Sequence, residues 1–170
     1  MFNMKISCIG LLTVAALTGA CFAEDTAPTK YYKLEFVVKE VDGAKVLNAR
    51  TYSAMVSGVV VLKEREVATG SCSIRTGSRV PYSTGEKTSY LDVGVSIDCR
   101  SVREAPGGLS LRVDVDISSL AQESNPPVIR QNKWASDVIV PLKKPAVILS
   151  SDDLTTKHQI QVELTATPIT

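Results

Sequence analysis

Two stretches in the middle of the chain alternate strictly between apolar and polar residues, and this alternation limits the fold more than any other feature. Every second residue is apolar from Leu91 to Cys99, and the same holds from Leu109 to Ile117. Such a period of two is the signature of strands that bury one face. Residues 105–108, Ala-Pro-Gly-Gly, are turn-forming and lie between the two stretches, so they predict an antiparallel hairpin.

The rest of the chain also favours strands, because weaker alternation recurs and turn residues interrupt it often. Residues 31–41 and 45–55 lie on either side of Asp42-Gly43, which predicts a second hairpin. We expect further strands at residues 72–77, 128–140, 146–149 and 158–167, and irregular loops at residues 57–70, 80–87 and 120–127. About eight antiparallel strands of this spacing predict a single all-β domain over residues 31–170, built as a β-sandwich or an open barrel.

The first 23 residues have the three parts of a secretory signal peptide. Lys5 supplies the positive start, residues 6–17 are apolar, and small residues precede a cleavage site after Ala23. Residues 24–30 then form a short linker before the β-domain. The alternative interpretation places a lipid on Cys21, although Thr18 stands where a lipoprotein signal would carry leucine.

The cysteines predict a disulfide. Cys8 and Cys21 lie in the leader, so Cys72 and Cys99 remain in the mature chain. Two thiols in an oxidising compartment usually pair, and a bond closing this loop would stabilise the fold by about 3–4 kcal/mol in the chain-entropy model. A metal pair and a catalytic thiol are the alternatives.

Charge and hydropathy exclude two classes of partner. The leader holds one of the 19 basic residues and none of the 18 acidic ones, so the mature chain is neutral. Nucleic-acid binding draws most of its affinity from clustered basic residues, which are missing here. No apolar run after the leader approaches the length of a membrane-spanning helix. We therefore expect a periplasmic or secreted protein, with membrane contact only through a lipid on Cys21 or through assembly as a ring.

The order of motifs in the middle of the chain resembles the C-terminal β-domain of bacterial secretins. In that domain a glycine and a proline precede a variable loop, an Asp-Val-Gly-Val strand follows, and a second strand ends near two serines before the return strand. The matching segments are residues 74–82, 90–98, 109–120, 127–131 with 136–141, and 143–149.

Secretins are ring-shaped outer-membrane channels of type II and III secretion systems, type IV pili and filamentous phage. The resemblance implies an all-β fold and a role in the cell envelope. Three departures stand against a pore. The chain leaves no room for the ring-forming periplasmic domains, Ser150-Ser151 replace a Gly-Gly pair, and polar residues 150–161 occupy the place of a membrane-inserting segment.

No constellation of residues predicts catalysis. His158 is the only histidine of the chain, and it lies at the end of a polar strand. We expect no catalytic residue, metal or cofactor. Tyr90 and Trp134 are the candidate residues of a contact surface. Arg112 and Asp98, on neighbouring strands, are predicted to form a cross-strand ion pair.

These patterns together predict an exported, non-catalytic β-domain that acts through protein–protein contacts in the bacterial cell envelope. The partner would be an envelope protein or a second copy of the chain. The first alternative is a minimal secretin-type outer-membrane channel or secretion component. The second is a secreted hydrolase or ligand-binding β-sandwich.

Overall fold

The computed structural model describes residues 30–58, 61–62, 65–66, 70–153 and 158–169. Over these residues the chain forms only strands, so it contains no helix that could cross a membrane. The predicted signal peptide with its cleavage site after Ala23, the candidate lipid site Cys21 and most of the linker lie outside the described residues. The strands are β1 (Tyr31–Asp42), β2 (Lys45–Ser57), β3 (Val61–Leu62), β4 (Arg65–Glu66), β5 (Gly70–Thr84), β6 (Lys87–Ala105), β7 (Gly108–Gln122), β8 (Val128–Val140), β9 (Ala146–Asp152) and β10 (His158–Ile169).

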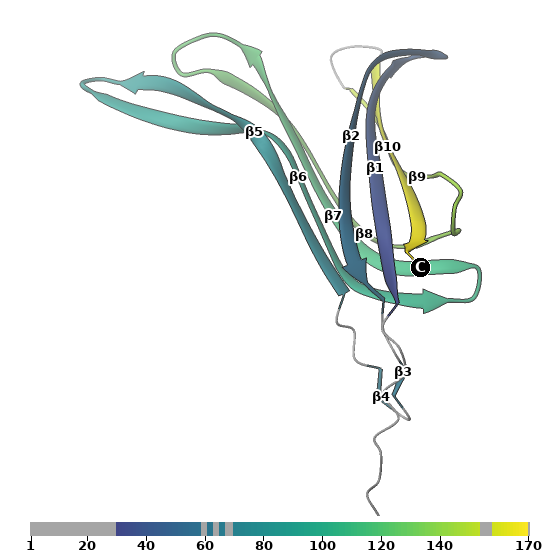
Figure 1. The fold of residues 1–170 in the computed structure, drawn as a ribbon. Helices are drawn as coiled ribbons and strands as arrows, with labels where there is room; N and C mark the ends of the chain where they lie inside the picture. The colour runs from purple at the N-terminus through teal and green to yellow at the C-terminus, as the bar shows by residue number, and fades with distance from the viewer. Residues whose placement is uncertain (1–29, 59–60, 63–64, 67–69, 154–157, 170) are drawn as a thin grey trace, which may run out of the picture.

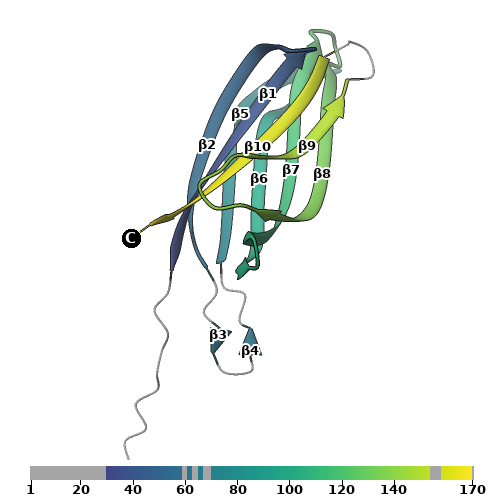
Figure 2. The ribbon, with the colours of Figure 1, turned by 90° about the vertical axis from the view of Figure 1, so that its right-hand side faces the viewer.

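Eight of these strands form two four-stranded antiparallel sheets that face each other (Figures 1 and 2). One sheet has the order β2-β1-β10-β9 and the other β5-β6-β7-β8, while β3 and β4 pair only with each other. The chain passes from the second sheet to the first after β8, where Leu142 bridges to Ala166 of β10. The predicted all-β class is confirmed, and the architecture is the sandwich rather than the barrel.

The core lies between the two sheets and is made by the alternating apolar positions. Leu34 and Phe36 of β1 belong to the same buried cluster as Ile97, Cys99, Leu111 and Val113 of the opposite sheet. Burying a side chain of this size contributes about 1.5–3 kcal/mol. The strict alternation of β6 and β7 therefore has the physical origin that the sequence indicated.

A β-bulge corrects the register of the β6–β7 hairpin. Next to the turn, Arg103 pairs with Ser110, whereas beyond the bulge Arg100 pairs with Arg112. Ser101 lies inside the bulge and has a positive φ of 55°. A shift of one residue moves a whole strand face to the other side. The bulge thus allows the apolar residues of both strands to point into the core.

The sheets are tied together near both ends. At one end the Tyr32 hydroxyl donates a hydrogen bond to Glu104, and Lys30 Nζ lies 2.9 Å from the same carboxylate. At the other, Arg130 of β8 lies 3.0 Å from the buried carboxylate of Asp153, which follows β9. Beyond this second contact the tips of the β5–β6 and β7–β8 hairpins project away from the other sheet (Figure 1).

This projection explains where the expected strands were wrong. Residues 80–87 were expected to be a loop, but β5 runs to Thr84 and only Gly85 and Glu86 make the turn. The strand expected at residues 72–77 is longer for the same reason, and β7 continues into the loop expected at residues 120–127. Residues 75–79 are exposed on both faces, so no apolar alternation marks them as strand.

Candidate interaction surface

The outer face of the β5–β8 sheet carries polar side chains joined by ion pairs. Arg75 lies 2.6 Å from Asp98, and Arg100 lies 2.5 Å from Asp114. The hydrogen bond from Arg75 lowers the pKa of Asp98 below its usual value, against an opposing effect of burial. Exposed pairs of this kind contribute about 0.2–1 kcal/mol each, so the network sets the character of the surface more than its stability.

The predicted pair of Arg112 with Asp98 is wrong. The β6–β7 register places Asp98 opposite Asp114 and Arg100 opposite Arg112, so the ion pair of Arg100 with Asp114 between these two strands is diagonal. Arg112 instead lies 3.3 Å from Asp137 of β8. The bulge in β6 sets the register between β6 and β7, and the sequence pattern did not reveal this bulge.

Two glycines remove the side chains from one rung of the β5–β6 ladder. Gly77 and Gly94 are direct register partners in the middle of β5. A Cβ on Gly94 would lie 2.1 Å from the Thr76 carbonyl oxygen, and one on Gly77 would lie 2.1 Å from the Val93 oxygen. Gly94 also has a φ of 150°. Only glycine tolerates this combination of close approach and backbone angle.

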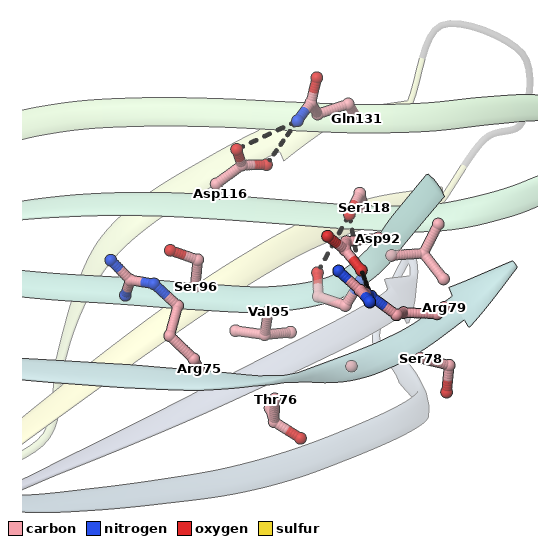
Figure 3. Close-up of a pocket in the computed structure, with 13 residues that line it drawn as sticks. Arg75, Thr76, Ser78, Arg79, Asp92, Val95, Ser96, Asp116, Ser118 and Gln131 are labelled. Atoms are coloured by element: carbon pink, nitrogen blue, oxygen red, sulfur yellow. Dashed lines mark hydrogen bonds and ion pairs between the residues drawn. The ribbon is translucent and has the colours of Figure 1, made fainter. Parts of the chain in front are cut away.

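The Gly77–Gly94 rung, which carries no side chains, continues across the sheet as a shallow transverse groove (Figure 3). The Gly94 N–H donates to Ser118 Oγ at 3.0 Å, and Gln131 of β8 is the register partner of Ser118. Small groups therefore form the floor from β5 to β7, and Gln131 lies at the β8 end. The cavity is about 460 Å³.

Fixed polar groups form the walls of this groove. Gln131 Nε2 donates to both oxygens of Asp116 at 2.9 and 3.0 Å, and Lys133 lies 3.3 Å from the same carboxylate. On the other side Arg79 lies 2.9 Å from Asp92. The cavity lining includes two arginines and two aspartates, so its formal charge is balanced.

The structure does not bring the two predicted contact residues together. Tyr90 is 60% exposed and shares the outer face of β6 with Asp92. Trp134 is partly buried and packs against the core from β8. Tyr90 alone therefore belongs to the outer surface near the groove.

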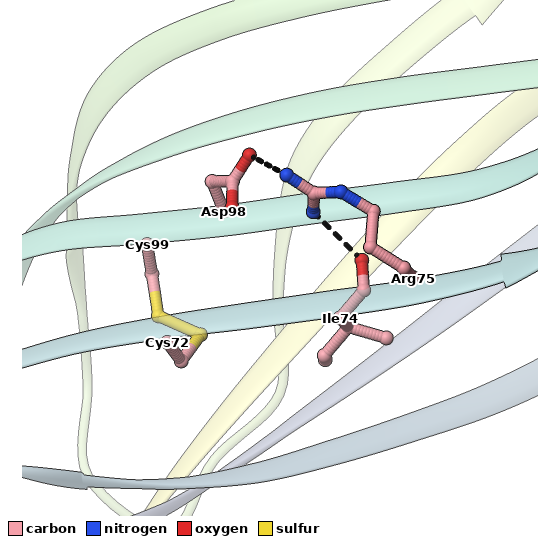
Figure 4. The surroundings of a disulfide bond; sticks show 5 residues. All are labelled: Cys72, Ile74, Arg75, Asp98 and Cys99. Carbon is pink, nitrogen blue, oxygen red and sulfur yellow. Dashed lines mark hydrogen bonds and ion pairs between the residues drawn. A yellow bond between two sulfur atoms is a disulfide. The ribbon is translucent and has the colours of Figure 1, made fainter.

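The predicted disulfide between Cys72 and Cys99 is confirmed (Figure 4). The two residues are direct register partners on β5 and β6, with their Cα atoms 4.9 Å apart. Cys99 is fully buried and Cys72 is partly buried. The bond takes up both thiols, which removes the metal pair and the catalytic thiol as alternatives, and it fastens the outermost strand of the sheet to its neighbour.

His158 lies far along the chain from these features and pairs with a carboxylate. Its Nδ1 is 2.8 Å from Glu40 Oε1, and both side chains are about one third exposed. The His158 carbonyl oxygen also accepts a hydrogen bond from the Asp153 N–H at 2.8 Å. These contacts join the ends of β1, β9 and β10. Among the described residues no group of three or more His, Cys, Asp or Glu is placed to hold a metal ion.

Strands β5 and β8 form the two edges of the β5–β8 sheet, and each of them pairs with only one neighbouring strand of that sheet. β8 has no proline between Val128 and Val140, and these 13 residues expose Ile139 to 59% and Val128 to 49%. β5 carries Pro81, which lacks a backbone donor. An uninterrupted, partly apolar edge such as β8 is a template for pairing with another strand.

Solved structures of secretins share this arrangement of strands. The secretin InvG of the Salmonella SPI-1 type III secretion injectisome matches 85% of this chain and 66% of its own, with a TM-score of 0.52 and 9% identity. GspD, the type II secretin from enteropathogenic Escherichia coli, matches with a TM-score of 0.51 and 9% identity over 85% of this chain and 70% of that chain. The chain has the fold of the secretin β-domain.

InvG also matches as part of the injectisome basal body with PrgH and PrgK, with a TM-score of 0.52 and 9% identity, over 85% of this chain and 47% of that chain. The match thus spans less than two thirds of the InvG chains. No protein-family model matches the sequence, and no curated protein matches it. At this level of identity the likeness establishes the secretin β-fold, which the motif order predicted over residues 74–151.

Sequence reasoning missed the transverse groove, although one signal for it was present. An isolated glycine inside an alternating strand indicates close backbone approach. Gly94 is such a residue. Its partner Gly77 lies in a segment without alternation, so the pairing of the two emerged only from the register.

Proposed function

We propose that this chain is an exported, non-catalytic secretin-like β-domain that acts through protein–protein contacts in the bacterial cell envelope. The open edge of β8 carries this proposal, because an uncovered strand supplies a row of main-chain donors and acceptors to a partner strand. The partner would be an envelope protein or a second copy of this chain.

The compartment in this proposal is the periplasm or the cell exterior. The Cys72–Cys99 disulfide supports it, because such bonds persist in oxidising compartments. The mature chain would begin at Glu24, after removal of residues 1–23, with residues 24–30 as a linker. Intact mass spectrometry of the purified protein reports the cleavage site and any lipid on Cys21.

The edge contact is tested by a charge placed at the exposed apolar residue of β8. We expect Ile139→Lys to abolish self-association or partner capture, because a lysine on an edge disfavours strand pairing. Tyr31→Lys is the matched control, since Tyr31 is 53% exposed on the interior strand β1 and Ile139 is 59% exposed. Size-exclusion chromatography with light scattering and an envelope pull-down are the measurements. A wild-type protein that is strictly monomeric and captures nothing contradicts the proposal.

A second candidate is a minimal channel subunit, favoured by the fold shared with InvG and GspD. In this case copies of the chain would assemble into a ring in the outer membrane. The charged outer face of the β5–β8 sheet argues against lipid contact there, since membrane barrels carry an apolar outer band. Heat-resistant multimers in detergent extracts of outer membrane would support the channel. Recovery of all the protein in the osmotic-shock fraction would remove it.

A further inference from the structure

The transverse groove has the features of a binding site that the edge contacts do not use. It crosses the outer face of the β5–β8 sheet along Gly77, Gly94, Ser118 and Gln131. Neighbouring strands lie about 4.8 Å apart, so four strands give the groove a length of roughly 14 Å. Its volume of about 460 Å³ lies within the range of small-ligand sites.

The polar groups of the groove favour an uncharged ligand. Arg75 and Arg79 are balanced by Asp92 and Asp116, so neither an anion nor a cation gains from the site as a whole. The walls nevertheless offer strong donors, strong acceptors, and the hydroxyl and amide groups of Ser96, Ser118 and Gln131. A ligand that both donates and accepts at many positions matches this set.

The position of the groove argues against an extended peptide. Peptides that add to a sheet bind along an edge through free main-chain groups. The floor here consists of interior rungs, where the main chain of β6 is paired with β5 on one side and β7 on the other. A ligand lying across these strands must bring its own hydrogen-bonding substituents, and hydroxyl groups do this.

Rigidity and an aromatic neighbour complete the site. Two hydrogen bonds from Gln131 hold Asp116 (Figure 3), and Lys133 lies 3.3 Å from the same carboxylate, so little ordering of the Asp116 side chain is needed on binding. Tyr90 lies two residues beyond Asp92 on the same strand face, about 7 Å along β6, and exposes 60% of its surface. Its ring offers a flat apolar surface beside the groove.

We infer that the groove binds a short segment of a neutral oligosaccharide, laid across the sheet from β5 to β8. The ring hydroxyls would hydrogen-bond to Asp116, Gln131 and Arg79, and the bare Gly77–Gly94 rung would leave room for the sugar rings. This inference does not depend on the edge contacts of β8.

The test is titration of the ¹⁵N-labelled protein with chitotetraose and with maltotetraose, followed by amide chemical shifts. We expect at least one of the two tetrasaccharides to change the amide chemical shifts of Gly77, Gly94, Ser118 and Gln131. Asp116→Asn and Gln131→Ala should each weaken the binding at least tenfold. Asp137→Asn and Gln159→Ala are matched controls outside the groove, and each should change the binding affinity less than twofold.

Tyr90→Ala tests the inference even if a groove variant fails to fold, because Tyr90 is exposed and its replacement should not affect folding. We expect Tyr90→Ala to weaken oligosaccharide binding about threefold. Two outcomes overturn the inference. One is the absence of shifts at the groove with both tetrasaccharides. The other is tighter binding of a neutral Gly-Ser decapeptide at the same amides, which would identify a peptide site.

Discussion

The Tyr32 hydroxyl of β1 donates a hydrogen bond to the Glu104 carboxylate of β6 and so joins the two sheets. Burial, together with this bond and the negative charge of Glu104, raises the pKa of Tyr32 to about 12. The hydrogen bonds from Tyr32 and Lys30 lower the pKa of Glu104.

Tyr32→Phe should therefore destabilise the fold by about 1.5–3 kcal/mol at pH 7, the cost of a lost hydrogen bond to a charged group. Since the folded pKa of Tyr32 lies above its unfolded value of 10.0, its contribution is complete below pH 10 and lost as the pH rises toward 12. Urea denaturation should thus show the gap between wild type and variant closing over this window. A gap that stays constant from pH 7 to pH 12 contradicts the assignment.

Gly94→Ala should destabilise the sheet by about 3–5 kcal/mol, because the new Cβ would lie 2.1 Å from the Thr76 oxygen at a φ of 150°. Gly43→Ala is the control, since Gly43 has a φ of 58° and open space around it. There we expect only the left-handed backbone cost of about 1–2 kcal/mol. Thermal and urea unfolding separate the two, and equal losses would argue against close strand approach.

Removal of the disulfide should lower stability by about 3–4 kcal/mol, as expected for a loop with a sequence separation of 27. The double variant Cys72→Ala/Cys99→Ala avoids a buried hydroxyl at position 99, where the native side chain is fully buried. Wild type in dithiothreitol should approach the stability of the variant, while the variant should not respond to the reductant. Unfolding curves with and without reductant measure both effects.

Asp153→Asn should cost about 1–2 kcal/mol, because the Asp153 side chain is only 7% exposed and pairs with Arg130 across the two sheets. Asp137→Asn is the matched control. Its side chain is 75% exposed and pairs with Arg112 on the outer face, so its loss should stay within about 0.5 kcal/mol. Hydrogen exchange should show faster opening of β9 in the first variant alone.

The sequence predicted the fold correctly where one face of a strand is buried and the other is exposed to solvent. Val95–Cys99 and Leu109–Ile117 pack in the core between the two sheets, so burial imposed the alternation that revealed them. The outer half of β5 has solvent on both faces, and its residues carry no such pattern. Local pattern alone could not place this half of the hairpin.

The candidate surface was harder to predict, because it depends on register. The bulge at Ser101 shifts β6 against β7 by one residue, and this shift decides which charges meet on the outer face. Arg112 pairs with Asp137 because the two are direct register partners on β7 and β8. Tyr90 could be placed outward from its neighbours in sequence, whereas the alignment of Gly77 with Gly94 required the pairing itself.

The disulfide has a mechanical consequence for any complex that this domain forms through its β5–β8 sheet. Strand β5 is the outermost strand, and Cys72 fastens it to Cys99 close to where the chain enters it. Tension applied to that end of β5 would load a covalent link before it could peel the strand away rung by rung. The domain could therefore carry a pulling load at this border without unravelling.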